Sequence, residues 1–369
     1  MKLSFPHMGS VVVYKKILEL LGHEVISPPR PSKKTFDFGV KYSPEHACFP
    51  YKTLTGTYIE LCEMGVDTIV TSGGSGPCRA GFYSEIHQKD LIELGYDVEL
   101  LVFDSFYRDK KKFMKVLKKL KEKNSWLKII STIRFTFQMV EELDKFDKKI
   151  HQIWAYEVKS GKTEKAWEEI KELFDKVKNK KELKKVVEEG NRIIDSIELH
   201  PVVEEKRIRI GIVGEIYVVM EPSVNFDIEK LFAELGCETE RSQYLFDWLN
   251  YNFSLPSFIK GTNTKSHEEE ILKKGEPYIE ISIGGHAKQS VGHIIDFKEK
   301  GFDGIIHLMP FGCLPELITQ SVTPKVSKQY DIPVLSLSLD EQSGQANSRT
   351  RVEAFLDLLR NKKVNKFSA

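Results

Sequence analysis

Three of the five cysteines lie in turns rich in glycine and proline, where a thiol has no evident packing role. They are Cys48 in "EHACFPYK", Cys78 in "SGGSGPCRAGFY" and Cys313 in "HLMPFGCLPEL". Cys48 and Cys78 are close to predicted helix starts, where the helix dipole and free N–H groups favour a thiolate. The neighbouring Gly and Pro residues leave the backbone free to approach a cofactor. These three thiols are therefore the candidate ligands of a metal cofactor.

The other two cysteines have a structural explanation. Cys62, in "IELCEMG", lies near the end of an amphipathic segment, and Cys237, in "ELGCETE", opens a predicted strand after a helix-ending glycine. Both positions are typical of a small buried hydrophobe. Five cysteines in a long chain with no disulfide framework favour metal binding or catalysis for the remaining three.

Three converging thiolates could hold several cofactors. Structural zinc takes four ligands, often from C-x₂-C pairs, which the sequence lacks, although His46 or His307 could complete a Cys₃His set. A [4Fe–4S] cluster with only three cysteine ligands would expose one iron to substrate. A nucleophilic Cys–His pair, Cys48 with His46 or Cys313 with His307, is the third option.

The elements that must position these thiols follow an α/β pattern at both ends of the chain. Apolar runs alternate with amphipathic segments over the first hundred or so residues, and helix-ending glycines recur at Gly22, Gly65 and Gly95. Residues 105–201 are instead highly charged with a helical period. Predicted strands then return at "KRIRIGIVGEIYVV" (206–219), "CETERS" (237–242), "YIEISIGG" (278–285), "FDGIIHLMP" (302–310) and "IPVLSLSLD" (332–340).

This pattern predicts two doubly wound α/β domains with parallel sheets, of the Rossmann or flavodoxin type. They would span residues 1–104 and 205–369, joined by a helical region at 105–204. Such folds bind ligands beyond the carboxyl ends of their strands. Cys78 and Cys313 both follow a predicted strand, so both are expected at that edge.

The composition bears on which partners the protein binds and on where in the cell it acts. The formal net charge is +1, from 55 basic and 54 acidic side chains, so no basic field favours nucleic acid or an anionic membrane. The first residues lack the apolar run of a signal peptide, and no stretch approaches the length of a membrane span. We expect a cytoplasmic protein.

Several motifs together resemble a known family. The runs "PEHACFPYK", "SGGSGPCRAGFY", "IGIVGEIYVVMEP", "FGCLPELITQSV" and "LDEQSGQANSRTRVEAFLDLL" are similar to those of 2-hydroxyacyl-CoA dehydratase and benzoyl-CoA reductase subunits. Within that superfamily they most resemble the acyl-CoA dehydratase activase-related proteins. Three residues depart from the usual pattern of the relatives, namely Gly312, Gln342 and Gln345.

The resemblance implies a cofactor and a partner. Relatives bind a [4Fe–4S] cluster through three cysteines between two α/β domains, and the counterparts here are Cys48, Cys78 and Cys313. A separate ATP-hydrolysing activator of the actin/Hsp70 type, with its own [4Fe–4S] cluster, supplies electrons of low potential. The implied activity is reduction or dehydration of an acyl-CoA or another small substrate at the open iron. The sequence leaves three arrangements open: the protein alone, a homodimer, or a complex with a second related subunit.

Two alternatives to this function stay open. One is a non-catalytic electron carrier or cluster scaffold. The other, placed third, is a reductase of the double-cubane type, whose cofactor would need more thiolates than this set offers.

Three polar residues are candidates for proton transfer or substrate contact: Glu215, His286 and Glu316. His293, in the same segment as His286, is better explained as a surface or core histidine. Arg79, directly after Cys78, could neutralise an anionic cluster. The glycine-rich run "GGSGPC" (73–78) resembles a phosphate-binding nest but lacks the spacing of a nucleotide-binding motif.

Overall fold

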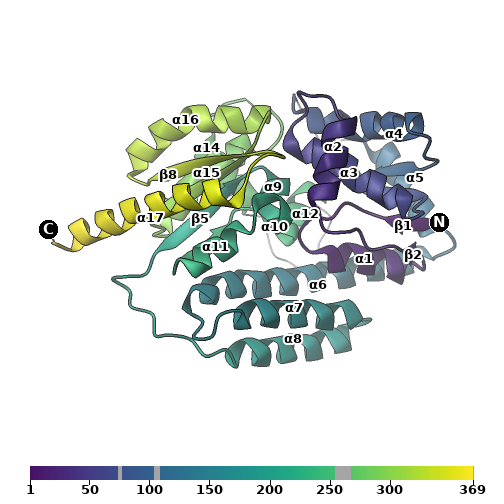
Figure 1. Cartoon of the computed structure of the whole chain (residues 1–369). Coiled ribbons are helices and arrows are strands. Elements are labelled where there is room, and N and C mark those ends of the chain that lie inside the picture. Colours follow the sequence, from purple (N-terminus) through teal and green to yellow (C-terminus); the bar gives the residue numbers. More distant parts are fainter. Residues whose placement is uncertain (74–76, 104–108, 254–266, 282, 369) are drawn as a thin grey trace.

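Two four-stranded parallel sheets form the framework of the protein. In the computed structural model, all residues are described except 74–76, 104–108, 254–266, 282 and 369 (Figure 1). The first sheet has the order β2-β1-β3-β4, from β1 (Lys2–Ser4), β2 (Glu24–Val25), β3 (Thr68–Ser72) and β4 (Glu99–Phe103). The second has the order β6-β5-β7-β8, from β5 (Arg209–Gly214), β6 (Glu238–Arg241), β7 (Gly304–Pro310) and β8 (Val334–Leu339). The predicted fold class, two doubly wound α/β units, is confirmed.

Helices cover both faces of the first sheet. They are α1 (Val11–Leu20), α2 (Lys33–Tyr42), α3 (Phe49–Glu63), α4 (Tyr83–Glu93) and α5 (Lys110–Lys121), with the short 3₁₀ helix η1 (Arg79–Phe82) leading into α4. One apolar core joins the inner side of α3 to Ile69 of β3. A second core joins α1 and α5 to Leu3 of β1 and Leu101 of β4.

Long helices fill the middle of the sequence. They are α6 (Trp126–Ile153), α7 (Lys162–Lys176) and α8 (Lys180–Asp195), with the 3₁₀ helix η2 (Trp154–Tyr156) after α6. In Figure 1 these helices lie side by side along one side of the molecule, below both sheets. Their shared apolar core also takes in Val13 of α1 and Leu245 of α12 (Leu245–Phe253), so the layer contacts both halves. The limits of the three predicted regions stay a prediction.

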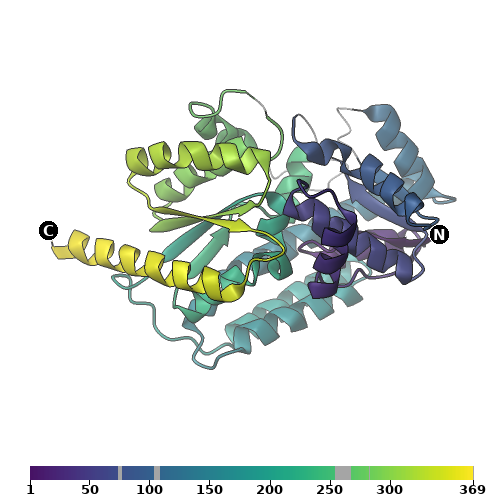
Figure 2. The same ribbon diagram turned by 45° about the horizontal axis from the view of Figure 1, so that its top comes forward.

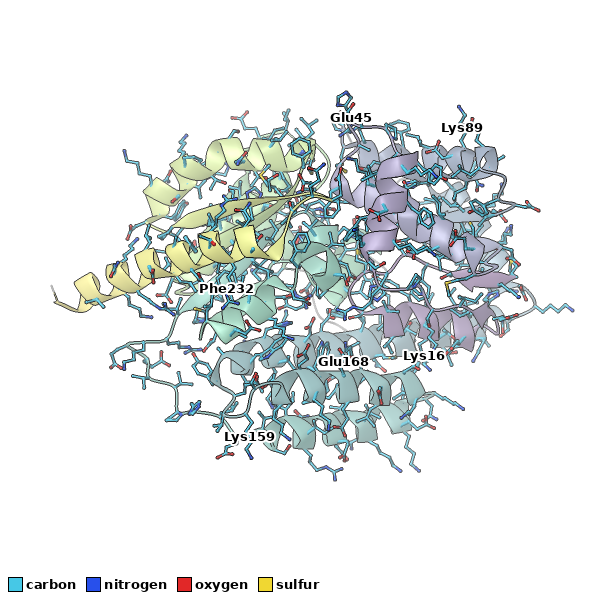
Figure 3. All side chains as sticks on the ribbon, viewed as in Figure 1. Lys16, Glu45, Lys89, Lys159, Glu168 and Phe232 are labelled. Carbon is cyan, nitrogen blue, oxygen red and sulfur yellow. The ribbon has the colours of Figure 1, made fainter. Side chains whose placement is uncertain are left out.

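The second sheet is covered in the same manner as the first. Its helices are α9 (Ile216–Met220), α10 (Pro222–Asn225), α11 (Ile228–Glu234), α14 (Glu268–Gly275), α15 (Ala287–Glu299), α16 (Leu314–Tyr330) and α17 (Gln345–Ser368). Figure 2 shows α17 and α16 on opposite faces of this sheet. Phe232 of α11 is fully buried, whereas the charged side chains of Lys89, Lys159 and Glu168, also labelled in Figure 3, are exposed.

One predicted strand ends too late and another is wrong. The run 206–219 contains strand β5, but its last residues are helical. Ile216–Met220 forms helix α9 because the Glu215 side chain caps the first N–H groups of the helix. The β-branched residues of this segment pack into the core from a helix as well as they would from a strand. In the run 278–285, none of the described residues is in a strand. Gly284 and Gly285 there adopt positive φ angles of 72° and 62°, and Ile281 is exposed, so the apolar pattern does not mark a buried strand.

An internal repeat relates the two halves. Helices α2 and α3 pack very closely at two glycines. A Cβ on either glycine would lie 1.9–2.2 Å from a backbone carbonyl oxygen of the other helix. Helices α14 and α15 show the same close packing, with a distance of 2.1 Å at both of their glycines. The pairs are Gly39 with Lys52, Gly56 with Thr35, Gly275 with Lys288 and Gly292 with Ile271. The spacing of these residues along the chain is identical in both halves, so α15 is the counterpart of α3.

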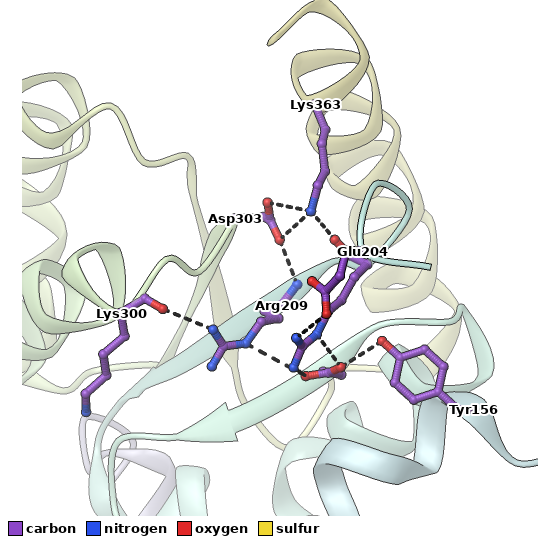
Figure 4. A network of polar contacts seen from close by, with 8 residues as sticks. Tyr156, Glu204, Arg209, Lys300, Asp303 and Lys363 are labelled. Carbon is purple, nitrogen blue, oxygen red and sulfur yellow. Dashed lines mark hydrogen bonds and ion pairs between the residues drawn. The ribbon is translucent and has the colours of Figure 1, made fainter. Parts of the chain in front are cut away.

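A polar network holds the amino ends of the second sheet (Figure 4). Glu238 of β6 accepts hydrogen bonds from Arg207 at 2.7 and 2.9 Å and from the Tyr156 hydroxyl at 2.7 Å. Asp303 accepts the backbone N–H of Arg209 at 2.9 Å and pairs with Lys363 of α17. This network lies at the opposite strand ends from the cysteines, so its role is to fix α17 and the chain entering β5.

In the described part of the chain, no helix is both long enough and apolar enough to cross a membrane.

Candidate functional site

The cysteines lie around a cavity at the carboxyl ends of the strands. The cavity has a volume of about 620 Å³. It is lined by residues that follow β1, β3, β5 and β7, including Pro6, Gly73, Glu215 and Cys313. In a sheet of order 2-1-3-4, the first and third strands flank the point where the connections diverge, and ligands bind there. The cavity therefore joins the ligand-binding edges of both sheets.

Each candidate thiol stands at the start of a helix. Cys48 is the N-cap of α3, Cys78 is the N-cap of η1, which leads into α4, and Cys313 is the N-cap of α16. Pro50 and Pro315 occupy the first turns of α3 and α16. None of the three cysteine side chains makes a regular capping hydrogen bond to its own helix.

The structure brings the three cysteines into one region. Cys48 and Cys313, 7% and 6% exposed, belong to one small buried cluster with Tyr51. Cys78 and Cys313 both line the cavity. Cys78 is only half-buried, and the charges of Cys48 and Cys78 act on each other.

Arg79 links the three cysteine segments. Its Nη1 donates to the carbonyl oxygen of His46 at 2.8 Å, and its Nη2 donates to that of Gly312 at 2.9 Å. Arg79 directly follows Cys78, while the two acceptors lie just before Cys48 and Cys313. One guanidinium therefore holds all three turns in register, which a single ammonium could not do with the same geometry.

Gly312 departs from the relatives for a local reason. Its φ is +74°, in the left-handed region, where a β-branched residue such as Thr is strained. A Cβ at this position would also lie 3.7 Å from the Cα of Cys48. The glycine therefore lets the turn before Cys313 approach the turn at Cys48.

Burial, rather than the helix dipole, dominates the thiol pKa values. Burial raises the pKa of Cys48 to about 11 and also raises those of Cys78 and Cys313. The nearby carboxylates of Glu215 and Glu316 raise them further. The expectation of a thiolate favoured by the helix start is thus outweighed, and these thiols need a cation nearby in order to ionise.

The alternatives that paired a cysteine with a histidine find no support in the geometry. His307 is fully buried, and both ring nitrogens are engaged, Nδ1 with Ser336 at 3.1 Å and Nε2 with Glu316 at 2.8 Å. His46 is exposed, and its carbonyl oxygen, not its ring, faces Arg79. A thiol with a raised pKa is also a poor nucleophile near neutral pH.

Glu215 carries a titratable carboxyl into the cavity. Its Oε2 accepts the backbone N–H groups of Tyr217 and Val218 at 3.0 and 3.2 Å. Burial raises its pKa to about 7, and the charge of Glu316 adds to the shift. Glu215 can therefore hold or release a proton at neutral pH.

Glu316 and His286 each carry a buried atom with no partner. Glu316 is fully buried, and although its Oε2 binds His307, its Oε1 meets no hydrogen-bond donor in the described structure. His286 lines the cavity, and its Nδ1 is likewise buried and unpaired among the described residues. Burial lowers the pKa of His286, which keeps its ring neutral.

The other residues singled out in the sequence are two cysteines, His293 and the glycine-rich run 73–78. Cys237 is buried in the core of the second sheet, and Cys62 packs at the edge of a core of the first. His293 is buried within α15, where burial lowers its pKa to about 3, and it is not among the residues lining the cavity. Of the nest at 73–78, residues 74–76 lie outside the described part of the chain.

Sequence reasoning missed Tyr83 and Tyr51. The Tyr83 hydroxyl is in hydrogen-bond contact with Cys48 Sγ. The two tyrosine rings meet edge to face at 4.8 Å, and the Tyr51 hydroxyl donates to Asp90 at 2.9 Å. Proximity of Tyr83 to Cys78 and of Tyr51 to Cys48 along the chain was the only available signal. Within the described residues, no three Cys, His, Asp or Glu side chains are arranged to bind a single metal ion.

Comparison with known families now adds to the geometry. Residues 4–71 match the model of the CoA enzyme activase uncharacterised domain, and residues 287–359 match the 2-hydroxyglutaryl-CoA dehydratase D-component. Each of the two stretches covers less than half of the chain, and both are similar to components of the 2-hydroxyacyl-CoA dehydratase system. The resemblance read from the sequence is thereby confirmed. The first match contains Cys48 and the second contains Cys313 and Glu316, whereas Cys78 lies in neither. No curated protein matches the chain significantly.

Proposed function

We propose that the protein is an iron–sulfur component of a 2-hydroxyacyl-CoA dehydratase-type system, with one [4Fe–4S] cluster on Cys48, Cys78 and Cys313. The observation that carries the proposal is that three cysteines at helix starts meet between two α/β halves. Cys78 and Cys313 line the cavity, and Cys48 packs with Cys313 in one buried cluster. The relation to the dehydratase superfamily supports it from a second direction.

The residues present fit such a cluster. Thiolate sulfur is the protein ligand that iron–sulfur clusters prefer. Burial raises the pKa of all three thiols, which keeps them protonated when nothing is bound. The positively charged iron of a bound cluster would stabilise their thiolate form. The Arg79 charge lowers the pKa of Cys78 and would offset the negative charge of a thiolate-bound cluster. When bound, the cluster would supply one-electron reduction at an iron with an open coordination position.

The protein's own residues would then bind and protonate the substrate. The cavity encloses a small ligand and reduces its contact with water. Glu215 would deliver or accept a proton there, because its pKa lies near 7. The charge of the buried Glu316 helps to raise the pKa of Glu215. The substrate is an acyl-CoA or another small reducible molecule.

Electrons of low potential would come from a separate protein. We propose an ATP-hydrolysing activator of the actin/Hsp70 type with its own [4Fe–4S] cluster, acting in the cytoplasm on this chain or on a homodimer or a complex with a related subunit. The match of residues 4–71 to a CoA enzyme activase domain supports an activator partner.

The first experiment is metal analysis of protein purified without oxygen. We expect about four iron and four sulfide per chain, and loss of both in Cys48→Ala, Cys78→Ala and Cys313→Ala. Cys62→Ala is the matched control, since it removes a thiol remote from the cavity and should retain the cluster. Zinc in place of iron, or iron retained in any of the three variants, would contradict the proposal. About eight iron per chain would instead support the double-cubane type.

A further inference from the structure

The start of α15 borders the cavity as well as the helix starts that carry the cysteines. The N-cap residues are Cys48 of α3, Cys78 of η1, Cys313 of α16 and His286 of α15. None of these four side chains makes a capping hydrogen bond to its own helix. The internal repeat makes α15 the counterpart of α3, although in its register His286 corresponds to Pro50 and Cys48 corresponds to Gly284.

The loop before α15 packs closely against the segments that carry Cys78 and Cys313. A Cβ on Gly285 would lie 2.6 Å from Cγ of Pro315 and 3.9 Å from Sγ of Cys78, and the φ of Gly285 is +62°. Only glycine fits so close an approach. The residue before His286 therefore lies against both Cys78 and the start of α16, which Cys313 caps.

The ring of His286 carries an unmet bonding requirement. Its Nδ1 is buried and lacks a hydrogen-bond partner within the described structure, although the ring lines the cavity. A buried polar atom left unpaired costs about 1–3 kcal/mol, so such an atom is generally completed by a water, an ion or a ligand. The free Oε1 of Glu316 acts on the same ring through its charge, which places a second unpaired group nearby.

We propose that His286 is the fourth, displaceable ligand of the cluster, occupying the open iron position until an external ligand replaces it. This inference rests on the function proposed above. Imidazole nitrogen binds iron, including in some iron–sulfur clusters, and a neutral ring has the lone pair that this requires. The exchange is a simple ligand substitution: the bond from nitrogen to iron breaks, the bond from the incoming donor atom forms, and no electron or proton is transferred. Glu316 would then stabilise the released ring.

The arrangement of the four side chains agrees with a cluster rather than with a single ion. They are not gathered as ligands of one metal ion in the described structure. A four-iron cluster separates its ligands by the width of the cluster itself, so the four helix starts can surround it from different sides.

The test is pulsed EPR spectroscopy of the reduced, iron-loaded protein, prepared with natural or ¹⁵N-labelled histidine. We expect a strong histidine-nitrogen coupling in the wild-type protein, which disappears on addition of cyanide. His286→Ala should lack the coupling while retaining iron, and should bind cyanide several-fold more tightly, because no internal ligand competes. His286→Gln replaces the alanine variant in this comparison if the latter does not fold.

Two further variants make the outcome decisive. His293→Ala alters another buried histidine of the same helix and should keep the nitrogen coupling. His286→Cys should give a cluster whose spectrum no longer responds to cyanide. An iron-loaded wild-type protein without histidine coupling, or a coupling that persists in His286→Ala, would overturn the inference while leaving the cluster itself intact. A wild-type protein that binds no iron would instead refute the function on which the inference rests.

Discussion

At the scale of single residues, Glu215 is subject to two opposing effects. Its carboxylate accepts two backbone N–H groups at the start of α9, and such hydrogen bonds favour the charged form. Burial disfavours the charge, and the negative charge of Glu316 adds to that effect. Burial is the larger effect, so the pKa rises to about 7 and the group titrates near neutral pH.

Glu215→Gln should therefore change how stability depends on pH. The folded-state pKa exceeds the ordinary value of 4.5, so the wild-type protein loses stability as pH rises between about 4.5 and 7. Glutamine keeps an oxygen for the two N–H groups but does not titrate. We expect the variant to gain stability relative to the wild type across this window, on the order of 1–3 kcal/mol. Urea unfolding of the cluster-free proteins at pH 5 and pH 8 measures it; a stability difference independent of pH would contradict the assignment.

The thiols of the site could be found from sequence because their local surroundings were unusual. Cys48, Cys78 and Cys313 each lie beside glycine or proline at the end of an element, and that signal is local. The bonds from Arg79 to the carbonyl groups of His46 and Gly312 join segments far apart in the chain, so no spacing reveals them. The direction of the thiol pKa shifts could not be predicted from the sequence either, because burial depends on the assembled fold.

At the scale of elements, long periodic segments were predicted well and short apolar runs were not. The helix at Phe49–Glu63 and the strand at Gly304–Pro310 follow their periodic patterns and glycine signals. Ile216–Met220 is apolar throughout, and such a run fits a buried helix as well as a strand. Capping by Glu215 decides between them. The α9 helix in turn fixes that carboxylate at the edge of the cavity.

The close helix pairs that follow from the internal repeat should not tolerate a side chain. A Cβ on Gly56 would meet a carbonyl oxygen at 1.9 Å and one on Gly292 would do so at 2.1 Å, so the helices must move apart. We expect Gly56→Ala and Gly292→Ala each to reduce the free energy of unfolding by about 1–3 kcal/mol. Gly344→Ala is the control, because nothing lies within 4 Å of its Cβ. Urea titration measures all three, and equal stabilities would show that the packing is looser than described.

At the scale of the whole molecule, the site joins two halves that also meet through direct contacts. Phe49 at the start of α3 belongs to the apolar core of the second sheet. Lys52 of the same helix pairs with Glu341 at 2.6 Å, and His7 after β1 lies 2.7 Å from the fully buried Glu221. Cys48 and Cys78 come from the first half and Cys313 from the second. A cofactor bound to all three would therefore add a link across the same boundary.

Cluster loading should consequently stabilise the entire protein. A ligand that binds the folded chain and not the unfolded one stabilises the folded state, by an amount that grows with the logarithm of its concentration relative to its dissociation constant. We expect anaerobic loading to raise the thermal midpoint of the wild-type protein and of Cys62→Ala by several degrees. Cys313→Ala should show no such rise, because it is expected to lose the cluster. Differential scanning calorimetry of loaded and iron-free samples provides the measurement. A rise in Cys313→Ala equal to that of the wild type would place the cluster within the first half alone.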